Sequence, residues 1–88
     1  MENNSWSKEN IYTGSYVNGK KDGHGVLKMI DGSIYTGEWR IDKMHGKGEI
    51  TYADGDIYTG SFVDGKKEGH GVFKYNDGYI YTGEFKNN

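Results

Sequence analysis

The sequence of 88 residues contains no cysteine, no proline and no long hydrophobic run. Without cysteine the chain cannot form disulfide bonds, and this composition suits a reducing compartment. No segment approaches the roughly 18 consecutive apolar residues of a membrane-spanning helix, and the polar first residues do not resemble a signal peptide. We therefore expect a soluble, intracellular protein in the cytoplasm.

The charged residues favour neither sign. The chain has 11 Lys and Arg residues and 13 Asp and Glu residues, which give a formal net charge of −2. Nucleic-acid-binding proteins usually carry a basic surface, so we expect no nucleic-acid partner. Only 33% of the residues are hydrophobic but 15% are aromatic, so a few large rings supply most of the apolar surface. A chain of this length forms at most one domain.

The tetrapeptide Ile-Tyr-Thr-Gly occurs four times at intervals of 23 residues, beginning at Ile11, Ile34, Ile57 and Ile80. A fixed period of this size predicts an array of similar units, each of which buries its apolar side against its neighbours. The predicted units are residues 12–34, 35–57 and 58–80, with a partial unit at residues 81–88 and a partial half-unit at residues 5–11.

Each unit has the pattern of a β-hairpin. Residues alternate along its first half, so that Tyr, Gly and a second aromatic residue lie on one face while Thr and Ser or Glu lie on the other. Asn-Gly or Asp-Gly pairs, which tolerate positive φ angles, mark the turns. In the second unit Ile41-Asp42 replaces such a pair, and we expect a turn of different shape there. Ile41 and Met44 could form an exposed contact point of their own, but we expect them to tuck against Trp39. The predicted fold is all-β, an elongated single-layer antiparallel meander of stacked β-hairpins with seven or eight strands.

Twelve of the thirteen aromatic residues fall on one predicted face, and Tyr79 is the exception. A single-layer sheet cannot bury both faces, so this face is a candidate for both core and recognition surface. The simpler alternative is that the rings form only the core of a thin protein. The residues predicted to line an aromatic groove for a partner are Trp6, Tyr12, Tyr16, Tyr35, Trp39, Tyr52, Tyr58, Phe62, Tyr75, Tyr81 and Phe85.

Residues at equivalent positions of the successive units form the columns of the repeat, and their pattern resembles a known repeat. Tyr-x-Gly-x-aromatic, followed by Gly, Gly-x-Gly and Asp-Gly at a 23-residue period, is similar to the MORN (membrane occupation and recognition nexus) repeat, and the resemblance extends from Tyr12 to Lys86. It implies β-hairpin repeats stacked into a groove-bearing sheet. It also implies a scaffold in a cytoskeletal, ciliary or cortical assembly, which holds a peptide or helix in the aromatic groove or associates with itself.

Catalytic and metal sites have little support in the sequence. His24 and His70 occupy the same column two units apart, on the order of 19 Å, which is too far to share a metal ion, so we expect no metal. Asp31, Asp54 and Asp77 belong to predicted turns. A repeat of similar units rarely supplies the asymmetric group of residues that acid–base chemistry needs, so we expect no enzyme and no cofactor.

Lysines recur at the predicted hairpin tips, at Lys20, Lys21, Lys43, Lys66 and Lys67. They are candidate contacts for anionic lipid, because each basic residue near such a surface contributes ~1 kcal/mol. Neighbouring acidic residues and the negative net charge favour solvated turns instead. The leading hypothesis is therefore a non-catalytic scaffold that binds a protein segment along the aromatic groove. The alternatives are self-association into a dimer or longer array, and peripheral binding of anionic lipid.

Overall fold

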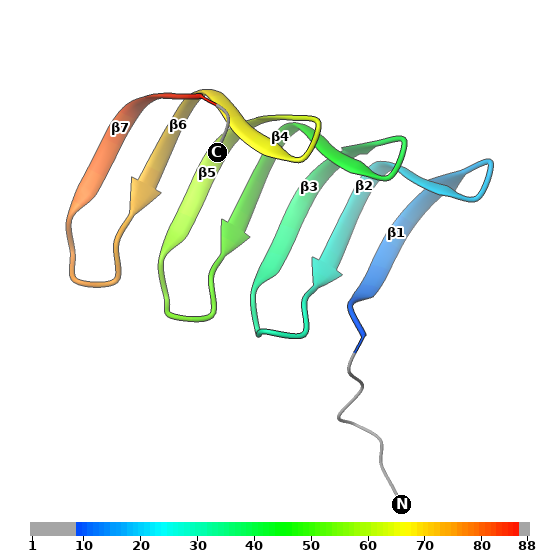
Figure 1. Ribbon diagram of the computed structural model, residues 1–88, viewed down its shortest axis with the longest axis horizontal. Coiled ribbons are helices and arrows are strands. Elements are labelled where there is room, and N and C mark those ends of the chain that lie inside the picture. Colours follow the sequence, from blue (N-terminus) through cyan, green and yellow to red (C-terminus); the bar gives the residue numbers. More distant parts are fainter. Residues whose placement is uncertain (1–8, 87–88) are drawn as a thin grey trace, which may run out of the picture.

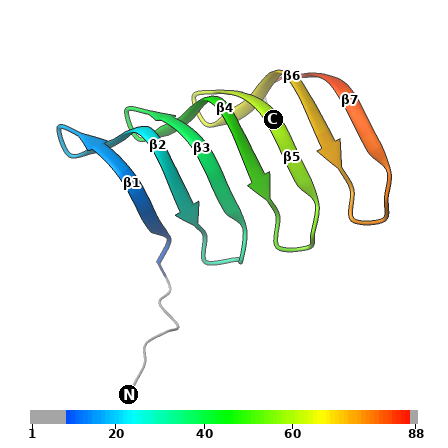
Figure 2. The same cartoon turned by 180° about the vertical axis from the view of Figure 1, so that it is seen from behind.

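The computed structural model describes residues 9–86, which form a single sheet of seven antiparallel strands in sequence order (Figure 1). The strands are β1 (Ile11–Val17), β2 (Lys20–Lys28), β3 (Ile34–Arg40), β4 (Lys43–Thr51), β5 (Ile57–Val63), β6 (Lys66–Lys74) and β7 (Ile80–Phe85). Among these residues there is no helix, hence none that could cross a membrane, and no second layer covers either face (Figure 2). The predicted all-β meander of stacked hairpins is confirmed. Most of the predicted half-unit at residues 5–11 lies outside the described residues.

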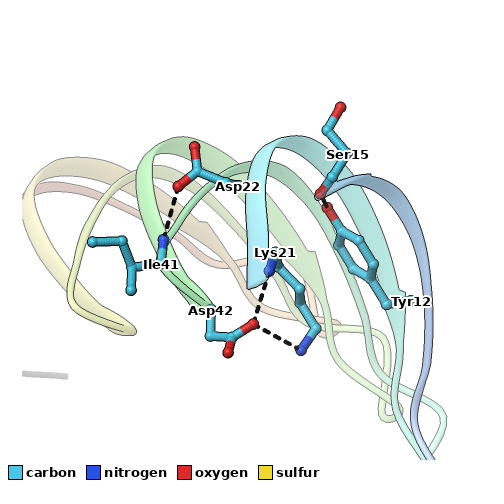
Figure 3. A network of polar contacts seen from close by, with 6 residues as sticks. All are labelled: Tyr12, Ser15, Lys21, Asp22, Ile41 and Asp42. Atoms are coloured by element: carbon cyan, nitrogen blue, oxygen red, sulfur yellow. Dashed lines mark hydrogen bonds and ion pairs between the residues drawn. The ribbon is translucent and has the colours of Figure 1, made fainter. Parts of the chain in front are cut away.

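The hairpins are bent, and glycine permits the bend. In the first hairpin Tyr12 pairs with Leu27 and Gly14 pairs with Gly25. A β-bulge then interrupts the pairing between Gly14 and Tyr16, and the same irregularity recurs in the second and third hairpins. Bulges bend a strand pair sharply. Each hairpin therefore forms an arch, and Tyr12 lies on the inner side of the first one (Figure 3).

The two-residue tips of the three hairpins share one backbone geometry. Asn18 and Gly19 both have positive φ angles, 52° and 79°, as tight hairpins require. Ile41 and Asp42 also have positive φ angles, 46° and 67°. The expectation of a different turn shape in the second unit is therefore wrong.

Contacts with the first hairpin hold the Ile41-Asp42 tip in place. Asp22 Oδ2 accepts a hydrogen bond from the Ile41 N–H (3.1 Å), and the Lys21 N–H donates to Asp42 Oδ1 (2.8 Å) (Figure 3). The Ile41 side chain is exposed, so the expectation that it tucks against Trp39 is wrong. A neighbouring hairpin, rather than the turn's own residues, fixes this backbone conformation.

Replacing Ile41 by asparagine is expected to stabilise the protein by about 1 kcal/mol. A left-handed backbone costs a β-branched residue roughly 1–2 kcal/mol, and asparagine adopts it more readily. Because Ile41 is 56% exposed, the change removes little apolar burial. Urea denaturation measures the gain, and Ile41→Val, which keeps the branched side chain, should give none. Equal midpoints for the two variants would contradict the assignment of strain to this residue.

The loops between units use their Asp-Gly pairs differently from the tips. In the first loop the Met29 N–H donates to the Ser33 carbonyl (2.8 Å), and Gly32 has a positive φ angle of 97°. Asp31 instead contributes its side chain, because its Oδ1 accepts a hydrogen bond from the Ser33 N–H (2.8 Å). Equivalent backbone bonds close the other two loops. This is the geometry of a hairpin loop that ends on a left-handed glycine.

One column of side chains links each loop to the next unit. Asn10 Oδ1 accepts a hydrogen bond from the Ile30 N–H (3.0 Å), Ser33 Oγ from the Ala53 N–H (3.2 Å) and Asp56 Oδ1 from the Asn76 N–H (2.8 Å). These contacts keep successive loops in register. No sequence pattern predicts the column, because a different residue type fills it in each unit.

Candidate functional site

A continuous line of aromatic rings runs across one face of the sheet, which we call the ring face. Neighbouring rings meet edge to face, with centroids 4.9–5.4 Å apart, in the order Tyr16, Tyr12, Trp39, Tyr35, Phe62, Tyr58, Phe85 and Tyr81. Aromatic pairs in this geometry contribute about 0.5–1.5 kcal/mol each beyond the area that they bury. The prediction that the rings form a single stripe is confirmed for these residues.

Glycine allows each of the first three repeated tyrosines to lie across the strand that follows it. Tyr58 crosses from β5 to β6 at Gly71, where a Cβ atom would lie only 2.5 Å from Tyr58 Cε1. Tyr58 Oη then donates to the Ser61 carbonyl (2.8 Å). The two preceding units repeat the arrangement. A glycine at this position is therefore a packing requirement, since any side chain would overlap the ring.

Burial along the ring face is greatest in the middle of the array. The buried core consists of Tyr35, Trp39, Ile50, Tyr58 and Phe62. At the ends of the line, Tyr16 is 57% exposed and Tyr81 is 45% exposed. The residues predicted to line the groove thus fall into two groups: central rings with almost no surface left for a partner, and accessible rings near the ends. Trp6, also predicted for the groove, lies outside the described residues.

A second group of rings lies beside the line toward its C-terminal end. Tyr52 and Phe73 stack with their centroids 5.8 Å apart, and Phe73 also contacts Tyr75 at 4.6 Å. The Phe73 ring is 6.5 Å from that of Phe85. Through Phe73, the predicted groove residues Tyr52 and Tyr75 therefore join the line of rings, and Tyr75 remains 46% exposed.

Two of the predicted tip lysines lie over the rings. Lys21 Nζ is 5.5 Å from the Tyr12 ring centroid and 5.6 Å from that of Trp39. Lys67 Nζ is 5.5 Å from the Tyr52 centroid and donates a hydrogen bond to Tyr52 Oη (3.0 Å). The remaining predicted lysines, Lys20, Lys43 and Lys66, are exposed. The five lysines do not share one surface, because strand alternation turns neighbouring side chains to opposite faces.

The ring face is hollowed where the first two hairpins meet. This hollow has a volume of about 410 Å³, and its apolar lining comes from Tyr12, Tyr16, Leu27, Trp39 and Met44. Met44 packs against the buried core, as expected from the sequence. Lys21 and Asp42 supply opposite charges beside it, with Nζ and Oδ1 3.8 Å apart (Figure 3). The hollow therefore combines accessible apolar surface with a charged pair.

The opposite face carries a feature that sequence reasoning missed. Pairing across the sheet places Ile11, Lys28, Ile34, Thr51, Ile57, Lys74 and Ile80 in one row. The isoleucines at both ends of the row are more than half exposed. The repeat sequence contained the information needed to predict this row. Isoleucine precedes each repeated tyrosine, and the alternation of side chains along a strand places the isoleucine on the face opposite the tyrosine. This face is therefore less polar than predicted.

A second hollow, of about 560 Å³, lies on the opposite face, and both His24 and His70 border it. His70 Nδ1 is 3.8 Å from Glu84 Oε2, and both side chains are mostly exposed, so the pair contributes little stability. Residues 9–86 contain no group of three His, Cys, Asp or Glu side chains that could hold a metal ion. His45 Nδ1 is enclosed and has no hydrogen-bond partner in that part of the chain.

Raising the pH above about 10 is expected to destabilise the sheet. Burial raises the pKa of Tyr35 above its ordinary value of 10.0, and it also raises the pKa values of Tyr58 and Tyr12. In the unfolded chain these tyrosines ionise at the ordinary pKa. The stability that comes from keeping them neutral in the folded sheet is therefore present in full below that pH, and it is lost as the pH rises toward their folded-state pKa values. Urea midpoints at about pH 8 and about pH 11 measure the loss, which should be smaller in Tyr35→Phe. Identical alkaline losses in the two proteins would contradict the assignment.

The repeated hairpins match a known family. The MORN repeat family model matches residues 12–34, 35–57 and 58–78, which make up most of the chain. The chain is also similar to alsin from Rattus norvegicus and from Homo sapiens, with 36% identity over 56 residues in each. The aligned part is 58% of this chain but only 3% of alsin. MORN repeats are generally non-enzymatic and form binding or scaffold modules. The chain belongs to the MORN repeat family.

Proposed function

We propose that this chain is a non-catalytic scaffold that holds a segment of another protein, a peptide or a helix, on its ring face. The main support is the hollow between the first two hairpins, because it exposes aromatic surface beside a charged pair. Tyr and Trp side chains in such positions often anchor partners. The buried rings beneath give the surface a fixed shape, so little conformational freedom would be lost on binding.

Tyr16 is the main proposed anchor. Its side chain is 57% exposed, and its ring packs edge to face against Tyr12 at 5.1 Å, which restrains it at the border of the hollow. Leu27 and Met44 offer apolar contacts beside it, and Trp39, only 6% exposed, contributes to the floor. An apolar side chain of the partner would fit against these residues.

The test begins with peptides selected from a random display library against the intact chain. In a Trp6→Phe variant Trp39 is the one remaining tryptophan, so its emission reports occupation of the hollow. Tyr16→Ala should weaken binding of the selected peptides about tenfold or more. Tyr79→Ala is the matched control, since Tyr79 is 75% exposed but lies outside the line of rings.

Circular dichroism establishes that both variants are folded. Peptides that bind Tyr16→Ala as tightly as the parent chain, or that leave the Trp39 emission unchanged, would refute the proposed site. The proposed setting is a cytoskeletal, ciliary or cortical assembly, in line with the resemblance to MORN proteins. A fluorescent fusion in the native cell should concentrate at such structures, and a uniform distribution would contradict this setting.

A further inference from the structure

We propose that the free edge of β7 binds an extended segment of a different polypeptide as an added antiparallel strand, and that this segment carries the sequence Gly-x-apolar. Among residues 9–86, β7 ends the sheet and is paired only with β6 (Figure 1). An edge strand presents N–H and C=O groups that another strand can pair with. This surface lies at the other end of the array from the hollow between the first two hairpins.

Tyr81 already has the orientation of a tyrosine with a strand beside it. Tyr81 Oη donates to the Glu84 carbonyl (3.0 Å), and its ring meets Phe85 at 5.2 Å and 87°. Tyr58 makes the same two contacts with the residues three and four positions after it, at 2.8 Å and at 5.1 Å and 87°. The edge of β7 is therefore preorganised as one half of a strand–strand contact, which lowers the entropic cost of binding.

The other half of this strand–strand contact would be a strand beside β7 that the Tyr81 ring covers. Tyr58 covers Gly71 and has no exposed surface, whereas Tyr81 is 45% exposed. A Cβ on Gly60 would lie 2.6 Å from the Gly71 Cα, but the nearest atoms to a Cβ on Gly83 all belong to Tyr81. The edge of β5 that faces β6 is thus a filled position, and the free edge of β7 is an empty position, of the same contact.

The complete hairpins define which sequence fits this edge. Opposite the repeated Tyr of β1, β3 and β5 lie Leu27, Ile50 and Phe73, and opposite the repeated Gly lie Gly25, Gly48 and Gly71. A strand in the same register on β7 must place an apolar residue opposite Tyr81 and glycine opposite Gly83. A Cβ at that glycine would overlap the Tyr81 ring, as it would at Gly71 beneath Tyr58.

A second copy of the chain does not supply such a segment. Its β2, β4 and β6 are paired on both sides. On its free edges, β1 and β7, a Cβ on Gly14 or Gly83 would lie 2.7 Å from Oη of Tyr12 or Tyr81 in the same strand. These glycines are already covered, so a second ring cannot occupy the same place. The residues before Ile11 contain no glycine. The proposed occupant is a segment of another polypeptide.

The test uses the intact chain and a capped peptide with the 9-residue sequence of β6, Lys-Lys-Glu-Gly-His-Gly-Val-Phe-Lys. A matched peptide has alanine in place of the second glycine, the residue that corresponds to Gly71. The glycine peptide should bind at least about tenfold more tightly, because only the alanine peptide meets the Tyr81 ring. It should also slow amide hydrogen exchange in β7.

Tyr81→Ala provides the matching change on the protein side. Once the ring is removed, the two peptides should bind with affinities within about twofold of each other, and circular dichroism shows whether the variant keeps its sheet. Absence of binding, equal binding of the two peptides to the parent chain, or discrimination that persists in Tyr81→Ala would overturn the proposal. So would protection located in β1 or around Tyr16, since the peptide would then occupy a different surface.

Discussion

Substitution of Gly71 by alanine is expected to lower the free energy of unfolding by about 3 kcal/mol. Gly71 lies beneath the Tyr58 ring, and an added Cβ would be 2.5 Å from Cε1 and 2.7 Å from Cζ. Tyr58 is fully buried and in edge-to-face contact with Phe62 and Phe85, so its ring cannot move aside without losing these contacts. Urea denaturation followed by circular dichroism measures the loss.

Two controls separate steric overlap from other effects of the added methyl group. Gly19→Ala places a Cβ where no atom lies within 4 Å, so its cost should reflect only the positive φ angle, roughly 1–2 kcal/mol. In a Tyr58→Leu background the smaller side chain leaves room, and Gly71→Ala should cost less there by about 1 kcal/mol or more. An equal cost in both backgrounds would show that the ring is not the obstacle.

Replacement of Tyr58 by alanine should lower the free energy of unfolding by about 3–5 kcal/mol. The ring has no exposed surface, its centroid lies 5.1 Å from that of Phe62 and 4.9 Å from that of Phe85, and its hydroxyl donates to the Ser61 carbonyl. The total stability of a small domain is only about 5–15 kcal/mol. Thermal denaturation should therefore show a large decrease in Tm.

Tyr81→Ala is the matched control, since Tyr81 occupies the same column of the repeat but is 45% exposed. It should cost about 1–2 kcal/mol, because much of the ring is already in contact with water. The difference between the two variants measures the effect of having a strand on both sides. Equal losses at the two positions would mean that burial does not determine the contribution of these rings.

The fold and the ring face are predictable because they depend on local features of the sequence. The 23-residue period, the alternation along each strand and the turn pairs each involve only a few neighbouring residues. The isoleucine row on the opposite face follows from the same alternation, and could have been predicted from it. Ile11 and Tyr12 are adjacent, and a strand must turn them to opposite faces.

Other features depend on contacts between units and could not be predicted from one column. Tyr35 and Tyr81 are equivalent in the repeat, yet one is fully buried and the other is 45% exposed, because within residues 9–86 no strand lies on the far side of Tyr81. The positive φ angle of Ile41 likewise depends on hydrogen bonds from the tip to Lys21 and Asp22 of the neighbouring hairpin. These contacts join residues about 20 positions apart, outside the range of turn preferences.

The way the repeated tyrosines lean gives the array a direction. Tyr12, Tyr35 and Tyr58 each lie over a glycine of the strand that follows in the sequence. Lengthening or shortening the array by whole units preserves this direction, because each added unit brings both a tyrosine and a glycine for a tyrosine ring to cover. Insertion of one tyrosine-bearing strand alone would instead set two such strands side by side, with two rings directed at one place. Whole hairpins are therefore the units by which such a sheet can be lengthened or shortened with each inserted tyrosine still lying over a glycine.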